Sequence, residues 1–501
     1  MEIDVQQLKE PLLEFGNGAT GVEPKVVIAA SGPFGSNRNS APTEITCGIV
    51  ALPAEIMPIR NWISRMHTPL IGEEKNAQRY KDFPGLEDAF NCHFIVRDEF
   101  VRSLNEEKYN RLRAEGGPAG FVALLEFFTE SISSLFSDLR PDCILVGFPD
   151  EIAELRVTNN KLTFSERAIL ERIEEEDEAN QLMLFKPTDE EKRLAAELLP
   201  QAEELLFRNF HRALKARCMS LPNPVPLQVL TRHAYVSSEA KQSDATRAWN
   251  LSTAMYYKAG RMLWRPSGLA KSTCFIGLSF HHLKRRSGDL VYASVAQAFS
   301  SEVEPFTLKG ASVSHDQVTV DKRPYLKAEQ AAELVERILD RFETLTGATP
   351  ARLVIHKTSR YEPSEVTGFR DTALARVASC DLVWMAPTGF RLLRRGMQPP
   401  RRGTLCRVGK SRYFLFTTGY VDWWAEYPGP HIPAPLEIGA ANDTDIVERS
   451  REILMLTKMS WNSAEALSRY PVTISFARKV GMVMTELEDD TPPNPLFRFY
   501  I

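Results

Sequence analysis

The sequence has few cysteines for its length, and none of them forms a Cys-x-x-Cys pair. The seven cysteines are scattered over 501 residues, at Cys47, Cys92, Cys143, Cys218, Cys274, Cys380 and Cys406. This scatter argues against a zinc ribbon, which needs paired ligands, and against a disulfide framework. It is typical of a protein that works in a reducing compartment.

The sequence also lacks long apolar runs. Its first residues, MEIDVQQLKEPLLEF, are polar and acidic and contain no signal-peptide core. No uninterrupted apolar run is long enough to cross a bilayer. We therefore expect a cytoplasmic protein with no membrane association.

Excess charge is the third thing that is missing. Lysine and arginine number 61 and aspartate and glutamate 65, which gives a formal net charge of -4. The whole protein is therefore no polycation, and any nucleic-acid role must come from local basic surfaces. With 43% hydrophobic and 25% charged residues, the chain is an ordinary globular one of roughly two to four domains.

The first half of the chain alternates expected strands with expected helices. Strands are predicted at 25–34, 44–53, 142–149 and 227–230, and helices at 120–139, 188–219 and 249–258. Asp142–Pro149 is a continuous apolar run, which is typical of a parallel strand that is buried on both faces. The alternation predicts a Rossmann-like α/β domain, which with the N-terminal segment occupies residues 1–266.

The second half, residues 267–501, has a different order of elements. Strands are predicted at 274–282, 291–299, 352–360, 381–387, 412–421 and 435–439, and helices at 326–345, 447–460, 462–470 and 472–487. Two neighbouring strands, a helix, a strand and further helices fit an RNase-H-like fold.

One stretch, residues 207–264, carries the strongest functional pattern. It reads FRNFHRALKARCMSLPNPVPLQVL and, further on, RAWNLSTAMYYKAGRMLW. His211 and Lys215 share one helical face, Gln228 lies on a short strand, and Lys258 ends a helix before Gly260. Lysines supply point charges, and amide and imidazole groups supply directed donors, so together they would suit a terminal phosphate. The alternative is that both lysines are solvated helix ends and that His211 is a satisfied histidine.

This stretch resembles the MID domain of Argonaute proteins, and its wording is closest to the short prokaryotic Argonautes, which have only MID and Piwi domains. In that family a helical His/Tyr-x-x-x-Lys, a Gln on the next strand and a Lys before a Gly bind the guide's 5′-phosphate. The resemblance gives these roles to His211, Lys215, Gln228 and Lys258. Further similar stretches are FLFTTGYVDWWAEYPGPHIPAPLEI, REILMLTKMSWNS, PVTISFARKVG and the ending LFRFYI.

The resemblance implies ligands and partners as well. It implies a guide RNA, a single-stranded DNA target, and a structural Mg²⁺ at the 5′ end of the guide that the carboxylate of Ile501 helps to hold. It also implies a heterodimer with a chain that carries an APAZ module and an effector domain, either a TIR or Sir2 NADase or a nuclease, and a higher oligomer on activation. The output would be defence against plasmids or phage.

The carboxylates of an active Piwi domain are missing. RNase-H-like nucleases need clustered carboxylates to hold two divalent ions. Here the first position falls on Ser279 in IGLSF, the second on Thr358 in VIHKTSR, and the last near Arg478 in SFARKVG. A hydroxyl is a weak Mg²⁺ ligand and an arginine repels the ion. We therefore expect no target cleavage and place any activity in the partner chain.

Basic residues gather in a window without acids. No Asp or Glu lies between Asp381 and Asp422, and the window holds Arg391, Arg394, Arg395, Arg401, Arg402, Arg407, Lys410 and Arg412. A second group is Lys284, Arg285 and Arg286. Such clusters suit the phosphate backbone of a guide or target, and of the first group Arg391, Arg394, Arg395, Arg401 and Arg402 are the main candidates. The alternative is a solubilising loop.

Two other functions compete with guided binding. One is a guided endonuclease with unusual metal ligands from Asp289, Glu302, Glu304 or Asp381. The other is a scaffold that binds a partner but no guide. Residues alone do not decide between RNA and DNA as the guide, nor do they give its first base or the identity of the effector.

Overall fold

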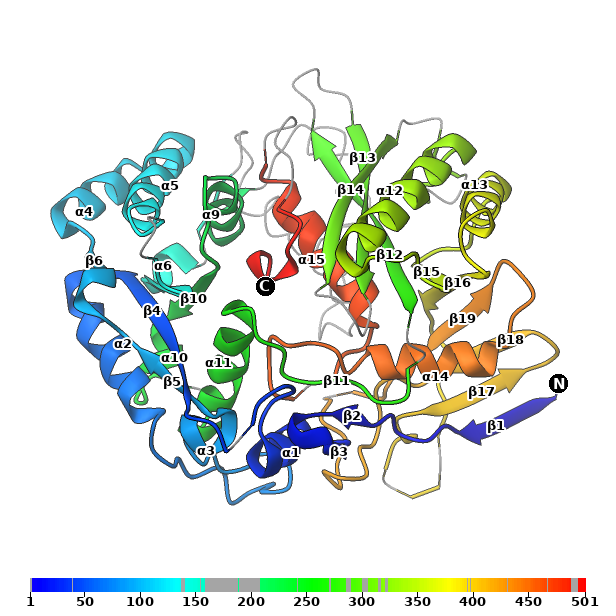
Figure 1. Cartoon of the computed structure of the whole chain (residues 1–501), viewed down its shortest axis with the longest axis horizontal. Helices are drawn as coiled ribbons and strands as arrows, with labels where there is room; N and C mark the ends of the chain where they lie inside the picture. The colour runs from blue at the N-terminus through cyan, green and yellow to red at the C-terminus, as the bar shows by residue number, and fades with distance from the viewer. Residues whose placement is uncertain are drawn as a thin grey trace.

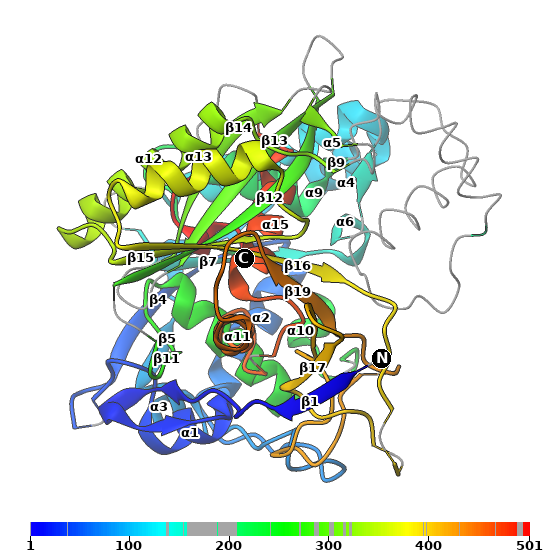
Figure 2. The ribbon, with the colours of Figure 1, turned by 90° about the vertical axis from the view of Figure 1, so that its right-hand side faces the viewer.

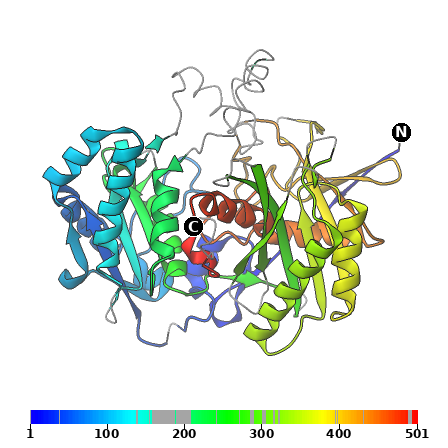
Figure 3. The ribbon, with the colours of Figure 1, turned by 90° about the horizontal axis from the view of Figure 1, so that it is seen from above.

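The computed structural model describes residues 2–37, 39–136, 140–153, 155–157, 188, 208–240, 242–269, 272–284, 290–299, 305–313, 317–319, 323–393, 395–396, 398–429, 431–465, 467–487 and 494–501; within three strands the side chains of residues 281–284, 290–297, 299 and 312 are not described. Two lobes lie side by side, and the last residues of the chain lie between them (Figures 1 and 3). None of the described helices is both long and apolar enough to span a bilayer.

The first lobe is a parallel sheet with helices on both faces. Its strand order is β10 (Leu227–Thr231), β7 (Cys143–Phe148), β4 (Thr43–Ala51) and β5 (Cys92–Ile95), with β6 (Val101–Ser103) also paired to β4. Every pairing is parallel. Helices α5 (Gly117–Ser133) and α9 (Phe210–Met219) pack on one face, and α2 (Pro53–Arg65) and α11 (Asp244–Lys258) on the other. This arrangement confirms the predicted α/β class.

The second lobe is built on a nine-stranded mixed sheet in the order β1-β17-β18-β19-β16-β15-β12-β13-β14. The antiparallel group is β12 (Thr273–Lys284), β13 (Leu290–Phe299) and β14 (Phe306–Val313), and β15 (Arg352–Lys357) and β16 (Ser379–Pro387) run parallel to β12. Helices α12 (Ala328–Thr346) and α13 (Pro363–Leu374) cover one face, and α15 (Val472–Met484) packs on the other. The order of strands matches the predicted RNase-H-like half.

Strand β1 (Ile3–Gln7) does not follow the predicted boundary at residue 266. It pairs antiparallel with β17 (Thr404–Val408) at the edge of the nine-stranded sheet, beside β18 (Arg412–Leu415) and β19 (Leu436–Ala440) (Figure 2). The first residues of the chain therefore belong to the second lobe, because the edge of β17 offers unpaired backbone groups that β1 satisfies.

Two predicted elements differ from the structure, and a third is only partly described. Residues 25–34 were expected to form a strand, but Pro24–Ser31 is helix α1, since Pro24 stands at the first turn and Gly32 ends it at φ 78°. The described residues of 462–470 form turns and bends where a helix was expected. Of the helix predicted at 188–219, Phe210–Met219 is helix α9, Arg208–Asn209 is the short strand β9, and residues 189–207 lie outside the described residues. The strands at 44–53, 142–149 and 227–230 and the helix at 249–258 are confirmed.

Candidate functional site

Helix α9 positions His211 and Lys215 on its inner face. The helix begins at Phe210 because the side chain of Asn209 accepts a hydrogen bond from the backbone N–H of Arg212 at 3.1 Å. Glu486, just after α15, fixes this end from the other lobe: it accepts from the Asn209 backbone N–H at 2.8 Å and from Arg208 Nε at 3.1 Å. The start of the helix is thus tied to both lobes.

Strand β10 and helix α11 bring Gln228 and Lys258 to the same place. Lys258 is the last residue of α11 and is 2% exposed. Its Nζ donates a hydrogen bond to Gln228 Oε1 at 2.8 Å. Gly260, at φ 80°, turns the chain away immediately after the helix. The predicted pair therefore meets, near the start of β10 and at the carboxyl end of α11.

The last residue of the sequence closes this cluster from the side of the second lobe. Lys215, which is 8% exposed, donates a hydrogen bond from Nζ to the main-chain oxygen of Ile501 at 2.7 Å. Phe497, a few residues before, stacks on Phe476 of α15 with ring centroids 3.5 Å apart. The structure thus brings Ile501 to Lys215, next to the residues named from the sequence.

The cluster includes a third lysine, Lys479, which the sequence analysis missed. Lys479 lies on α15, half-buried, and its charge lowers the pKa of both Lys215 and Lys258. The signal was present in the motif SFARKVG: Lys479 is flanked by Phe476, Ala477 and Val480, which are all buried. A lysine on the buried side of an apolar helix is costly and needs a reason.

Burial and neighbouring positive charges lower the pKa values of the basic groups in this cluster. Burial, and then the charge of Lys479, lowers the pKa of Lys215 to about 7. Burial, and then mainly the charge of Lys215, lowers the pKa of Lys258 well below its usual value. His211 follows the same trend: burial and the charges of Lys215, Lys258 and Arg212 hold its pKa well below 6.5. Buried cations that depress one another's pKa form a site for an anion.

His211 has a free donor or acceptor position at this site. Its Nε2 is buried and has no hydrogen-bond partner among the described residues. The ring packs edge-on against Phe148 at the end of β7, with centroids 6.2 Å apart. A buried polar atom without a partner is expensive in a folded protein, so it is commonly reserved for a ligand.

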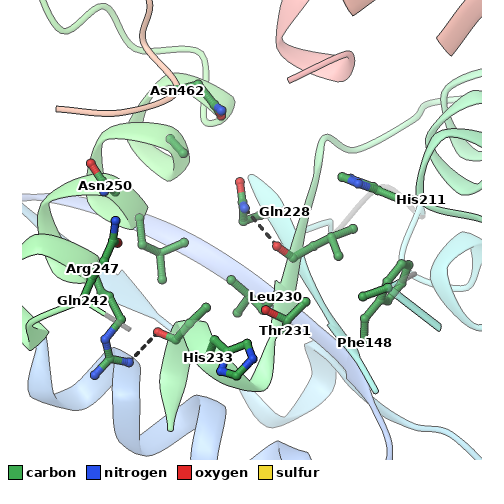
Figure 4. A pocket seen from close by; sticks show the side chains of 15 residues that line it. Phe148, His211, Gln228, Leu230, Thr231, His233, Gln242, Arg247, Asn250 and Asn462 are labelled. Atoms are coloured by element: carbon green, nitrogen blue, oxygen red, sulfur yellow. Dashed lines mark hydrogen bonds between the residues drawn. The ribbon is translucent and has the colours of Figure 1, made fainter. Parts of the chain in front are cut away.

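A cavity of about 630 Å³ opens beside the cluster. Figure 4 shows His211 and Phe148 at one end, Asn250 and Asn462 at the other, and Gln228 between them. Arg247 in its wall is already paired with Asp244 and donates to the Ala234 carbonyl at 2.9 Å. The remaining polar lining is mostly amide, hydroxyl and imidazole, which are groups that give directed hydrogen bonds. The volume and lining fit a nucleotide-sized ligand.

Two of the predicted degenerate positions lie on neighbouring parallel strands, Ser279 in the middle of β12 and Thr358 directly after β15. In the register of β12 with β15, Leu278 lies opposite Lys357, so Ser279 and Thr358 are the next residues on neighbouring strands. Helix α15 crosses β12 closely, because the backbone of Thr473 lies against Gly277 where no Cβ would fit. Arg478 lies further along the same helix and stacks on Tyr470, 4.4 Å from its ring centroid.

The carboxylates near these strands are already engaged. Glu365 is fully buried and accepts from Lys357 Nζ at 2.6 and 2.8 Å. Asp381 lies toward the other end of the sheet, opposite Val354, and Arg352 and Arg449 both bind its Oδ2. Asp289, Glu302 and Glu304 lie outside the described residues. No group of three or more His, Cys, Asp or Glu side chains in the described part of the chain could hold a metal.

The whole chain can be matched to solved structures. It is similar to Clostridium butyricum Argonaute bound to a guide DNA and a 19-mer target DNA, with a TM-score of 0.59, 15% identity and coverage of 99% of this chain and 55% of that one. Drosophila Piwi gives a TM-score of 0.58 and 11% identity, with coverage of 99% of this chain and 56% of that one. A. aeolicus Argonaute gives a TM-score of 0.53 and 12% identity, with coverage of 99% of this chain and 55% of that one. The chain has the Argonaute fold. It spans about half the length of these structures. No protein-family model and no curated protein matches the sequence.

On this Argonaute fold the predicted basic window divides into exposed and buried residues. Arg391, Arg395 and Arg401 are exposed, although Arg401 lies 3.3 Å from Asp422. Arg402 is 4% exposed, and its guanidinium binds Glu10 and the carbonyls of Thr417 and Leu454. The assignment of Arg402 to a nucleic-acid surface is therefore wrong: it ties three chain segments together. Arg394, Arg285 and Arg286, and the side chain of Lys284, lie outside what the structure describes.

Other arginines of the window find acids from elsewhere in the chain. Arg407 lies 3.6 Å from Asp4 on β1, and Arg412 lies 2.9 Å from Glu437 on β19. A segment without acids in sequence is thus partly neutralised in space. The sequence analysis did not consider two arginines outside the window. Arg360 stacks on Trp384 near the carboxyl ends of β15 and β16. Arg469 faces the Tyr470 ring that Arg478 also contacts.

The lowered lysine pKa values predict how anion binding depends on pH. A bound phosphate raises the pKa of Lys215 and Lys258, so binding takes up protons once the pH exceeds the free value of about 7 for Lys215. Affinity for a 5′-phosphorylated oligonucleotide should therefore fall by about 10- to 100-fold between pH 7 and pH 9. Fluorescence anisotropy across this range measures the change. A 5′-hydroxyl oligonucleotide serves as control and should show little dependence; equal slopes for both would contradict the assignment.

Proposed function

We propose that this chain binds the phosphorylated 5′ end of a guide nucleic acid and uses the guide to bind a complementary target. The observation that carries the proposal is the cluster of the buried Lys215 and Lys258 with the half-buried Lys479, which lies beside a nucleotide-sized cavity. A terminal phosphate supplies the missing negative charge, and the unpartnered His211 Nε2 and the Gln228 amide supply direction.

The guide is RNA and the target is single-stranded DNA in this proposal. Support comes from the resemblance of residues 207–264 to short prokaryotic Argonautes and from the fold shared with an Argonaute that was solved with a guide and a target. The protein then reads the ends and backbone of the nucleic acid, and base pairing with the guide selects the sequence. Arg391, Arg395 and Arg401 are the exposed arginines placed to meet a phosphate backbone.

A magnesium ion would enter this site only together with the guide. Ile501 offers a main-chain oxygen next to Lys215 Nζ, but the surrounding ammonium groups repel a cation while no anion is bound. Guide phosphate oxygens and water would supply the remaining ligands, as Mg²⁺ prefers. The ion would then neutralise phosphate charge that the lysines leave uncompensated.

We further propose that the chain does not cut its target. Ser279 and Thr358 supply hydroxyls where two-metal hydrolysis needs carboxylates, and Glu365 is held by Lys357. The purified chain with a 5′-phosphorylated guide RNA should bind a matched DNA and leave it intact in Mg²⁺ or Mn²⁺. Gel electrophoresis of an end-labelled target measures this. Cutting at one defined position in the matched strand, and not in a mismatched one, would establish a guided endonuclease in its place.

The effector activity that follows target binding then comes from a partner chain in the cytoplasm. The chain spans about half the length of its structural neighbours, and the resemblance supplies the partner: an APAZ module joined to a TIR or Sir2 NADase or a nuclease, in a heterodimer that assembles further when the target binds. Co-expression with the neighbouring open reading frame, followed by sizing and sequencing of bound nucleic acid, tests this. A single chain free of short 5′-phosphorylated RNA would refute the guided sensor.

A further inference from the structure

Two histidines face each other in the first lobe, far from the guide site along the chain. His67 follows helix α2, and His93 lies on strand β5. Their Nδ1 atoms are 3.3 Å apart, and the planes of the two rings are inclined by 14° to each other. His93 is one-third exposed, so the space between the two rings is reached by solvent.

The outer nitrogens of both rings already have acceptors. His67 Nε2 lies 3.3 Å from the carbonyl oxygen of Phe94, which can only accept, so Nε2 carries the hydrogen. His93 Nε2 lies 3.5 Å from Glu87 Oε2, and a carboxylate attracts an N–H in the same way. With a hydrogen on each Nε2, the two Nδ1 lone pairs face each other at a distance where they repel unless a proton or a metal ion lies between them.

We propose that His67 and His93 bind a divalent transition-metal ion through their Nδ1 atoms. Two Zn–N bonds of about 2.0–2.1 Å at a tetrahedral angle separate the nitrogens by about 3.3–3.4 Å, which agrees with the spacing here. The outer partners are those of metal-bound histidines, which donate their second N–H to a carboxylate or a backbone carbonyl. Imidazole nitrogen selects zinc, nickel or copper over magnesium or calcium.

The site has two protein ligands, and water completes it. Among the described residues no third His, Cys, Asp or Glu is placed to join a metal at this point. A proton shared between the rings is the competing occupant, and Glu87, His93 and the Phe94 carbonyl are the groups that act on His67.

A metal ion bound here would join elements that support helix α11, which carries Lys258 of the proposed guide site. It would join the end of α2, β5 and helix α3 (Leu86–Phe90), which carries Glu87 and is already fixed by a hydrogen bond from Leu86 N to Met66 O at 3.0 Å. Phe90 of α3 packs against Trp249 and Tyr256 of α11, the helix that ends at Lys258. The proposal does not rest on guide binding, since the site is complete in the protein alone.

Titration with Zn²⁺ and Co²⁺ tests the proposal on the full chain, freed of tags and treated with chelator. Calorimetry should show one saturable equivalent per chain for the native protein, with affinity at least about tenfold lower in His93→Gln and in Glu87→Gln. The Glu87 side chain is mostly exposed, so its substitution leaves folding intact and keeps the test informative if His93→Gln unfolds. His233→Gln changes a histidine in the wall of the cavity beside the lysine cluster. It is the matched control and should bind Zn²⁺ as the native protein does.

Two results would overturn the proposal. One is the absence of saturable Zn²⁺ or Co²⁺ binding at neutral pH, which would leave the histidines as a proton-sharing pair. The other is binding that His93→Gln and Glu87→Gln both leave unchanged, which would place the ion at another site, such as one with buried cysteines exposed by partial unfolding.

Discussion

Replacing Lys258 with methionine should weaken the binding of a 5′-phosphorylated guide by about 1.5–3 kcal/mol, or roughly 10- to 150-fold in Kd. Lys258 is buried, ends α11 and holds Gln228 Oε1, so its ammonium is fixed where the phosphate would lie. Methionine keeps the length and the apolar stem of the side chain and removes only the charge. Lys215→Met and Lys479→Met should act in the same direction. Anisotropy titration with labelled guide measures all three.

The controls separate the phosphate from the rest of the guide. Arg217 lies exposed on the same helix as Lys215 and points away from the cluster, so Arg217→Ala should change affinity by less than about threefold. The three methionine variants should lose little affinity for a 5′-hydroxyl guide. Equal losses for both guides would mean that the cluster serves the fold and that the phosphate binds elsewhere.

Replacing Glu365 with alanine should lower the free energy of unfolding by about 3–5 kcal/mol. Glu365 and Lys357 are 0% and 1% exposed, and the glutamate also accepts from the backbone N–H groups of Leu326 and Glu362. Its removal leaves the Lys357 ammonium buried without a partner, and the two backbone N–H groups lose their acceptor. Denaturant unfolding at pH 7, followed by circular dichroism, measures the loss.

A double variant provides the matched control for this ion pair. Lys357→Met with Glu365→Leu removes both charges and should recover most of the lost stability, since a buried pair is worth little against apolar residues of similar size. Glu343→Ala removes a half-exposed partner of Arg376 and should cost less than about 1 kcal/mol. If Glu365→Ala costs no more than Glu343→Ala, the Lys357 ammonium must reach water or lose its proton easily.

The local pattern of the sequence was enough to name most of the residues that the structure brings together at the proposed phosphate site. His211 and Lys215 are one turn apart on a helix, Gln228 lies at the start of a strand that follows Pro226, and Lys258 ends a helix before Gly260. Lys479 was missed because it comes from the other lobe, 221 positions after Lys258, and only the packing of α15 brings it in. Spacing rules describe one element at a time and cannot see such a contact.

The errors have the same origin. Arg402 looked like part of a basic window because its acid, Glu10, is almost four hundred residues away in sequence. Residues 25–31, with Val26, Val27 and Ile28, have the composition of a strand, yet Pro24 and Gly32 make them a helix against the core. Composition is a weak guide for short apolar segments, where the ends decide.

The pairing of β1 with β17 has a consequence for how the molecule is made. Ile3–Gln7 leaves the ribosome about four hundred residues before its partner, Thr404–Val408. At about 5–20 residues per second, β1 waits roughly 20–80 s before it can add to the sheet. Its Ile3 and Val5 side chains, exposed even in the finished fold, are uncovered throughout that interval. Synthesis rate and chaperone supply thus set how much of the nascent chain reaches the complete nine-stranded sheet.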